Sequence, residues 1–310
     1  LAYPAEWAMM KNNTEVLIKR VKNNSGDLKA LVALASIYIQ EARITGNLDF
    51  YNKAALKCVN AVLAKDASHF EALTFKSTIL LSQHRFEEGL TVARQVQQTY
   101  PLNAYVYGLL TDAHVELGNY PQALEAAEKM ISIRPDIRSY SRIAYLREIH
   151  GDIPGAIEAM GLAIDAGTGG DENTEWCRVQ LGRLYEKIGK MDFAKMHYTI
   201  AEKNRENYPY ALAGLADIAA SEKKYVDAIA SYQQADSLIP DHRFKEGLVE
   251  LYELTGEKEK ATQMAASILD YMKQFSSTNH KNKEEGQNED HELAHAYMGV
   301  GDYSKALEFA

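Results

Sequence analysis

The chain has 310 residues, of which 46% are hydrophobic, 25% are charged and only 7 are proline. This composition is ordinary for a globular protein, and the low proline content suits a chain built mainly of helix. The formal net charge of −9 argues against a nonspecific nucleic-acid binder, and no apolar run approaches the ~20 residues that cross a bilayer.

The first segment, residues 1–27, is predicted to form one or more N-terminal capping helices. Residues 14–23 have the pattern of the second helix of this cap, and Asp27 is a side chain suited to begin the next helix. The chain opens with Leu1 rather than Met and stops inside a helical pattern at Ala310. We therefore expect a trimmed piece of a longer protein, from which an export signal could have been removed.

One sequence phrase returns along the rest of the chain. In residues 104–136 a helical pattern reaches a G-N-Y turn, and a second helical pattern follows and ends at Pro135. Related phrases occupy residues 175–204 and 210–241. The turn position of each copy falls on Gly46, His84, Gly118, Gly151, Gly189, Lys223, Gly256 and Gly301. Their spacing gives a base period near 34 with local insertions, which is typical of a helix-turn-helix solenoid.

The repeated pattern is an aromatic residue, Leu-Gly/Ala, Tyr, Gly-x-Tyr, Ala, Tyr/Phe, Ala and Pro, and it resembles the tetratricopeptide repeat (TPR) family over about residues 28–310. The resemblance implies an all-α fold, a right-handed α-α superhelix of antiparallel helix hairpins. Seven repeats would fill residues 28–273, a polar mobile loop residues 274–288 and a truncated eighth repeat residues 289–310. A small residue recurs where the paired helices press closest, at Ala123, Ala156, Ala194, Ala228, Ala261 and Ala306.

Near the C-terminus, His291, Glu292 and His295 have the H-E-x-x-H spacing of a zinc peptidase. Such an enzyme also needs a third metal ligand, and the extended zincin motif fails here at its glycine and its final histidine places. The L-A-x-x-Y pattern of a repeat helix covers the same residues. We therefore interpret the segment as a repeat helix, with a zinc peptidase as the alternative.

No other segment carries a convincing catalytic or cofactor motif. The glycine-rich stretch at 166–171 lacks the G-K-[ST] ending of a phosphate loop and follows a helix, so we expect a flexible connector between hairpins. The two cysteines, Cys58 and Cys177, lie far apart and are expected to be buried free thiols. The sequence thus predicts a protein that is not an enzyme, with no catalytic residues, no metal and no cofactor.

The TPR resemblance implies that the first helices of the hairpins line a concave groove that holds a peptide or a helix of another protein. Tyr, Trp and Arg, which dominate binding hot spots, fall at groove positions two and nine in the middle of the array. The candidate partner-binding residues are Tyr105, Arg138, Tyr145, Trp176, Arg183, Tyr210, Asp217, Arg243 and Glu250.

Two alternatives remain for these positions. An aromatic residue at the second position can instead pack under the preceding repeat, and exposed acids can be no more than a solvated face. If they do bind, the acidic residues Asp112, Asp217 and Glu250 would favour a basic partner. The groove has no lysine at the fifth position and no asparagine at the ninth, so the carboxylate clamp of co-chaperone TPR domains is not expected.

Together these patterns predict a non-enzymatic scaffold that binds a protein or an extended peptide, no nucleic acid, and has no transmembrane segment in this fragment. The alternative is a TPR subunit of a larger bacterial envelope or secretion assembly. Asparagine- and lysine-rich loops and diverged repeats resemble exported bacterial TPR proteins, which favours an exported or periplasmic location over a cytoplasmic one. The ligand, the compartment and the oligomeric state are not readable from the sequence.

Overall fold

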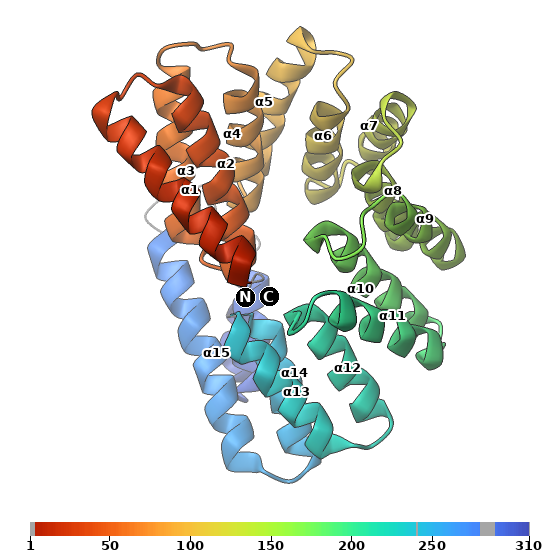
Figure 1. The fold of residues 1–310 in the computed structure, drawn as a ribbon. Coiled ribbons are helices and arrows are strands. Elements are labelled where there is room, and N and C mark those ends of the chain that lie inside the picture. The colour runs from red at the N-terminus through yellow and green to blue at the C-terminus, as the bar shows by residue number, and fades with distance from the viewer. Residues whose placement is uncertain (1–3, 240, 280–288, 310) are drawn as a thin grey trace. The chain divides into compact units, whose positions relative to one another are not determined.

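The computed structural model describes residues 4–239, 241–279 and 289–309, which form seventeen α-helices and no strand (Figure 1). None of the helices in these ranges is long and apolar enough to cross a membrane. In chain order they are α1 (Pro4–Asn23), α2 (Leu28–Thr45), α3 (Leu48–Leu63), α4 (Phe70–Ser82), α5 (Phe86–Thr99), α6 (Ala104–Glu116), α7 (Tyr120–Ile133), α8 (Ile137–Ile149), α9 (Ile153–Asp165), α10 (Glu172–Lys187), α11 (Met191–Asn204), α12 (Pro209–Ser221), α13 (Tyr225–Leu238), α14 (His242–Leu254), α15 (Lys258–Asn279), α16 (Glu289–Gly299) and α17 (Tyr303–Glu308).

The first compact unit, residues 1–206, contains five helix hairpins. Helix α1 packs on α2, and the hairpins α2–α3, α4–α5, α6–α7, α8–α9 and α10–α11 follow (Figure 1). The second helix of each hairpin also packs on the first helix of the next. This arrangement is the α-α repeat stack that the sequence pattern predicts.

The second compact unit, residues 207–310, contains the hairpins α12–α13, α14–α15 and α16–α17. Here too the second helix of one hairpin packs on the first helix of the next. The sequence analysis predicts one continuous array from residue 28 to 273, whereas the structure divides it after residue 206. The repeat register passes through this point unbroken, so the period alone carries no sign of the boundary.

The turn inside each hairpin confirms the predicted register. All eight turn positions have a positive φ, between 60° and 82°. Six are glycine, which adopts this left-handed backbone without steric cost. The other two, His84 and Lys223, adopt it at a cost of roughly 1–2 kcal/mol each. The turn geometry is therefore required by the fold even where the sequence does not supply the favoured residue.

Small and large buried residues alternate in the packing between helices. The recurring alanine is fully or almost fully buried in all six copies, from 0% to 6% exposed. Aromatic side chains close the space between hairpins, and Tyr198, Tyr232 and Tyr252 are all buried. The small residue lets the two backbones approach, and the aromatic ring fills the wedge that remains.

The two ends of the repeat array differ from the expectation in their boundaries. Helix α1 starts at Pro4 rather than residue 14, because Pro4 suits a first helical position and no later residue interrupts the helix. Asp27 does cap α2, accepting a hydrogen bond from Ala30 N at 3.0 Å. Helix α15 continues to Asn279, since neither glycine nor proline interrupts it, so a loop starting at 274 is wrong. Residues 280–288 of that predicted loop lie outside the described residues.

Candidate functional site: the inner face of the first helices

The first helices of the hairpins form a continuous layer in the unit of residues 1–206. Helix α2 contacts α4, α4 contacts α6, α6 contacts α8 and α8 contacts α10. In the described part of this unit the second helices make no comparable contacts with one another. A stack curves toward the layer whose members lie closer together, so α4, α6, α8 and α10 line its inner side. We call the surface that these four helices present the inner face.

A chain of three side chains, one each from α4, α6 and α8, crosses the inner face. The hydroxyl groups of Thr78 on α4 and Tyr105 on α6 are 3.0 Å apart and share a hydrogen bond. The guanidinium carbon of Arg138 on α8 lies 5.7 Å from the centre of the Tyr105 ring. A cation at this distance is attracted by the electrons of the ring face. Tyr105 thus orients Arg138 without neutralising its charge.

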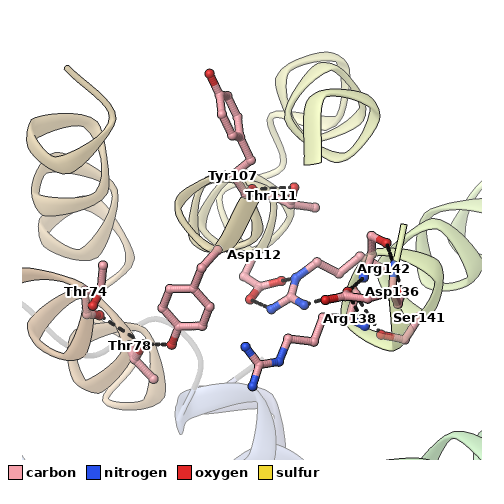
Figure 2. A network of polar contacts seen from close by, with 11 residues as sticks. Thr74, Thr78, Tyr107, Thr111, Asp112, Asp136, Arg138, Ser141 and Arg142 are labelled. Atoms are coloured by element: carbon pink, nitrogen blue, oxygen red, sulfur yellow. Dashed lines mark hydrogen bonds and ion pairs between the residues drawn. The ribbon is translucent and has the colours of Figure 1, made fainter. Parts of the chain in front are cut away.

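Next to this chain, Asp112 and Arg142 form a two-bond ion pair between α6 and α8 (Figure 2). Arg142 Nε and an Nη atom donate to the two carboxylate oxygens at 2.8 and 2.6 Å. The guanidinium lies over Gly108, where an added Cβ would be 3.3 Å from Arg142 Cζ. Burial disfavours the charged guanidinium, but the Asp112 carboxylate outweighs this effect and raises the pKa of Arg142.

Two aromatic side chains on the helices of the inner face are partly exposed. Tyr145 on α8 is 47% exposed and Trp176 on α10 is 40% exposed. Partial burial raises the pKa of the Tyr145 phenol, and the nearby charges of Glu116 and Glu148 raise it further. Large apolar side chains left in water on a packed scaffold mark a surface that gains by being covered.

The cations of the inner face fall into two groups. Lys187 on α10 is ion-paired with Glu148 on α8, as Arg142 is with Asp112. Arg138 and Arg183 have no carboxylate within ion-pair distance among the residues that the structure describes. Figure 2 shows the Arg138 side chain extending away from α8 beside the Asp112–Arg142 pair.

In the unit of residues 207–310, the same positions form a similar but neutralised pair. The Arg243 guanidinium carbon on α14 lies 5.9 Å from the centre of the Tyr210 ring on α12, repeating the Tyr105–Arg138 arrangement. Arg243 also donates to Asp241, with Nε 2.9 Å from Oδ1. Asp217 accepts a hydrogen bond from the buried Tyr232. These polar groups are therefore already engaged within the unit.

The predicted candidates are thus divided between the two units. Tyr105, Arg138, Tyr145, Trp176 and Arg183 lie on the helices that form the inner face, and their role in binding stays a prediction. Tyr210, Asp217, Arg243 and Glu250 lie on α12 and α14 of the other unit. The structure adds a residue that the pattern did not single out, Arg142, at the sixth position of α8. The glycine opposite it, Gly108, was the available signal.

The glycine-rich connector before α10 is anchored rather than free. The fully buried Glu175 carboxylate accepts from Gly170 N at 2.8 Å, from Asn204 Nδ2 at 2.8 Å and from Arg178 Nε at 2.9 Å. Arg205 donates to the Gly170 carbonyl at 2.7 Å. A second long-range contact joins Arg43, at the end of α2, to Asn173 at 2.9 Å. These bonds fix the start of α10, and with it the position of Trp176.

The H-E-x-x-H segment belongs to α16, as the repeat register predicts. Leu293, Ala294 and Tyr297 are buried at the L-A-x-x-Y positions. The side chains of His291, Glu292 and His295 lie outside the described residues. Within the side chains that are described, no group of three His, Cys, Asp or Glu residues could hold a metal ion.

Both cysteines are buried free thiols in the structure, as expected. Burial raises the pKa of Cys177 to about 12. Because the thiolate is the reactive form, a thiol with this pKa is unreactive at neutral pH.

The stacked helix hairpins define a helical-repeat protein. Residues 76–137 and 179–243 match the family model described as tetratricopeptide repeat. This chain is also similar to the small glutamine-rich tetratricopeptide repeat-containing protein 2 of Saccharomyces cerevisiae. The two sequences are 27% identical over 146 residues, which are 46% of this chain. The chain spans 40% of the length of that yeast protein. The chain therefore contains tetratricopeptide repeats in these two regions.

Solved structures with low sequence identity share the fold. The Cut9–Hcn1 hetero-tetramer of the APC/C matches with a TM-score of 0.63 at 15% identity, covering 96% of this chain and 55% of that one. PilF of Pseudomonas aeruginosa matches with a TM-score of 0.54 at 15% identity, covering 66% and 92%. A human IFIT1 dimer with PPP-AAAA matches with a TM-score of 0.61 at 16% identity, covering 84% and 67%. These likenesses describe the fold alone.

Proposed function

We propose that this protein is a non-enzymatic scaffold that holds another protein, or an extended peptide, on the inner face of α4, α6, α8 and α10. The observation that carries the proposal is the exposure of Tyr145 and Trp176 on two helices in contact with each other. Each ring would bury a large area on binding while losing little rotamer freedom, which is why such residues dominate interface energies.

The surroundings of these rings support a rigid binding surface. Helix α10 is fixed at its start by Glu175, and α6 and α8 are joined by the Asp112–Arg142 pair. A surface held in place before binding loses less conformational freedom when a partner arrives. The inner face is therefore suited to recognition without rearrangement of its backbone.

Crosslinking tests the proposal without knowledge of the partner. A photo-reactive phenylalanine analogue replaces Tyr145 in one sample and Leu124 in the other. Leu124 is 45% exposed on α7, a second helix, and so is a matched control for exposure. In extract from the source cell, the probe at Tyr145 should capture a discrete protein, whereas the probe at Leu124 should not.

Competition completes this test. An excess of unlabelled wild-type protein should abolish the crosslink, and an excess of the Trp176→Ala variant, checked for unchanged helical circular dichroism, should not. Equal competition by the two proteins, or equal capture from both probe positions, would show that the inner face is not the binding surface.

Two finer alternatives from the sequence remain predictions. Membership of a larger bacterial envelope or secretion assembly depends on the identity of the captured partner. The zinc-peptidase alternative depends on His291, Glu292 and His295, whose side chains lie outside the described residues.

A further inference from the structure

Resting on the function proposed above, we propose that the guest of the inner face is an extended acidic peptide segment, with one carboxylate held by Arg138 and a second by Arg183. The inference specifies the charge and the spacing of the guest, neither of which the repeat pattern determines.

The first argument is the contrast between paired and unpaired cations. Arg142 and Lys187 each have a carboxylate partner across a helix interface, at Asp112 and Glu148. Arg138 and Arg183 have none in the part of the chain that the structure describes. In a protein with a formal charge of −9, two arginines that the chain does not neutralise are available to an anionic guest.

The second argument is that one of these cations is already oriented. Arg138 lies over the Tyr105 ring, and the Tyr105 hydroxyl is held by Thr78 at 3.0 Å. A stacked guanidinium keeps its hydrogen-bond donors in the ring plane free for a carboxylate. Less side-chain freedom is then lost when the guest binds.

Two arginines and two aromatic residues have a defined arrangement on α8 and α10. On α8 the arginine comes first and the aromatic residue, Tyr145, follows seven residues later. On α10 the order is reversed, with Trp176 seven residues before Arg183. Seven helical residues rise about 10 Å, and neighbouring helices lie about 8–10 Å apart. The two arginines therefore occupy opposite corners of a patch, roughly 14 Å apart.

This separation sets the spacing within the guest. An extended chain advances about 3.4 Å per residue, so about four residues span the distance. Side chains at i, i+2 and i+4 of an extended chain point to the same side. The guest thus has acidic residues at i and i+4 and an apolar residue at i+2, which lies between Tyr145 and Trp176.

Two of the three acids that the sequence offered to a basic guest are already engaged. Asp112 is bound to Arg142, and Asp217 accepts from Tyr232. A nucleic acid is disfavoured because its affinity comes from neutralising many phosphates, and the proposed site relies on two arginines in a protein with a net charge of −9.

The test uses the full chain and three fluorescent 12-residue peptides of glycine and serine with leucine at position six. Positions four and eight are both glutamate, both glutamine or both lysine. By fluorescence anisotropy, the glutamate peptide should bind about tenfold more tightly than the glutamine peptide, and the lysine peptide should bind more weakly than either.

Single-residue variants assign the effect. Arg138→Gln and Arg183→Gln should each weaken binding of the glutamate peptide about three- to tenfold, and neither should change binding of the glutamine peptide. Arg94→Gln is the matched control, because Arg94 is an exposed arginine on the second helix α5 with no ion pair within the described residues. This variant should bind all peptides as the wild type does.

Several outcomes would overturn the acidic guest. These are no binding of the glutamate peptide at millimolar concentration, equal or tighter binding of the lysine peptide, or unchanged affinity in both arginine variants. A 12-nucleotide RNA that binds more tightly than the glutamate peptide, and loses affinity in the arginine variants, would identify a nucleic acid instead. If the glutamate and glutamine peptides bind alike and Trp176→Ala abolishes the binding of both peptides, the inner face is a binding surface but its guest is not acidic. If Trp176→Ala leaves the affinity for every peptide unchanged, the proposed binding function of the inner face is wrong as well.

Discussion

A methyl group added at Gly182, in the middle of α10, has no room. An ideal Cβ at this position would lie 2.4 Å from Cε1 and 2.8 Å from Cζ of Tyr198 on α11. Non-bonded carbon atoms need about 3.5–4.0 Å, so the ring would have to move by about 1 Å or more. Tyr198 is fully buried and its hydroxyl donates to Glu186 at 2.8 Å, so it cannot swing out without losing that bond.

Gly182→Ala is therefore expected to destabilise the protein. Overpacking a buried contact costs typically 1–3 kcal/mol, and replacing glycine by alanine inside a helix returns up to about 1 kcal/mol. The net loss should be about 1–2 kcal/mol. Urea unfolding followed by circular dichroism measures it, and hydrogen exchange across α10 and α11 locates it, since repeat arrays need not unfold in one step.

Gly161→Ala in α9 is the matched control for this prediction. A Cβ at Gly161 would have no atom within 4 Å, so only the gain in helix propensity remains and the variant should be more stable. In a Gly182→Ala, Tyr198→Leu double variant, the shorter leucine side chain replaces the ring. The added methyl group at residue 182 should then lower the free energy of unfolding by less than it does beside Tyr198. If Gly182→Ala stabilises the protein as Gly161→Ala does, the close approach of Tyr198 to α10 is not real.

Two further changes test the support of the site and a buried histidine. Glu175→Gln should speed hydrogen exchange in residues 167–173 several-fold, because the buried carboxylate that binds Gly170 N and the Arg178 guanidinium loses its charge; unchanged exchange would contradict the anchoring. Burial, aided by Arg178, lowers the pKa of His197 to about 4, so below its ordinary value of 6.5 the unfolded chain takes up a proton that the folded chain does not. The free energy of unfolding should thus fall as the pH is lowered from 6.5 to 4. The fall should be smaller in His197→Phe, which keeps a ring against Tyr185. Equal pH dependence of the two proteins in urea unfolding would refute this prediction.

The sequence predicts the hairpins well because each repeat satisfies the same local requirements. The turn positions recur wherever two helices reverse direction, and even His84 and Lys223 take the left-handed backbone there. Burial of the alanine follows from its place between paired helices. These features depend on residues within one repeat, so a period near 34 is enough to find them.

The ends of the helices and the division into two compact units are harder to predict from the sequence. Helix α15 runs to Asn279 because polar residues without glycine or proline continue a helix as readily as they form a loop. The division after residue 206 falls between two copies of the same repeat pattern, so the period does not mark it. A repeat period describes the members of an array and not the strength of their contacts.

The charge of the candidate site depends on ion pairs between side chains of different repeats. The sequence is least informative about these pairs. Asp112 on α6 and Arg142 on α8 belong to different hairpins, 30 residues apart, and the guanidinium lies over the bare backbone of Gly108. Read one position at a time, Asp112 indicates a basic guest. Once Asp112 is neutralised by Arg142, the unpaired Arg138 and Arg183 favour an anionic guest, and the expected sign of the guest reverses. Charges at a repeat groove therefore have to be counted after cross-repeat pairing, because only the unpaired ones act on a partner.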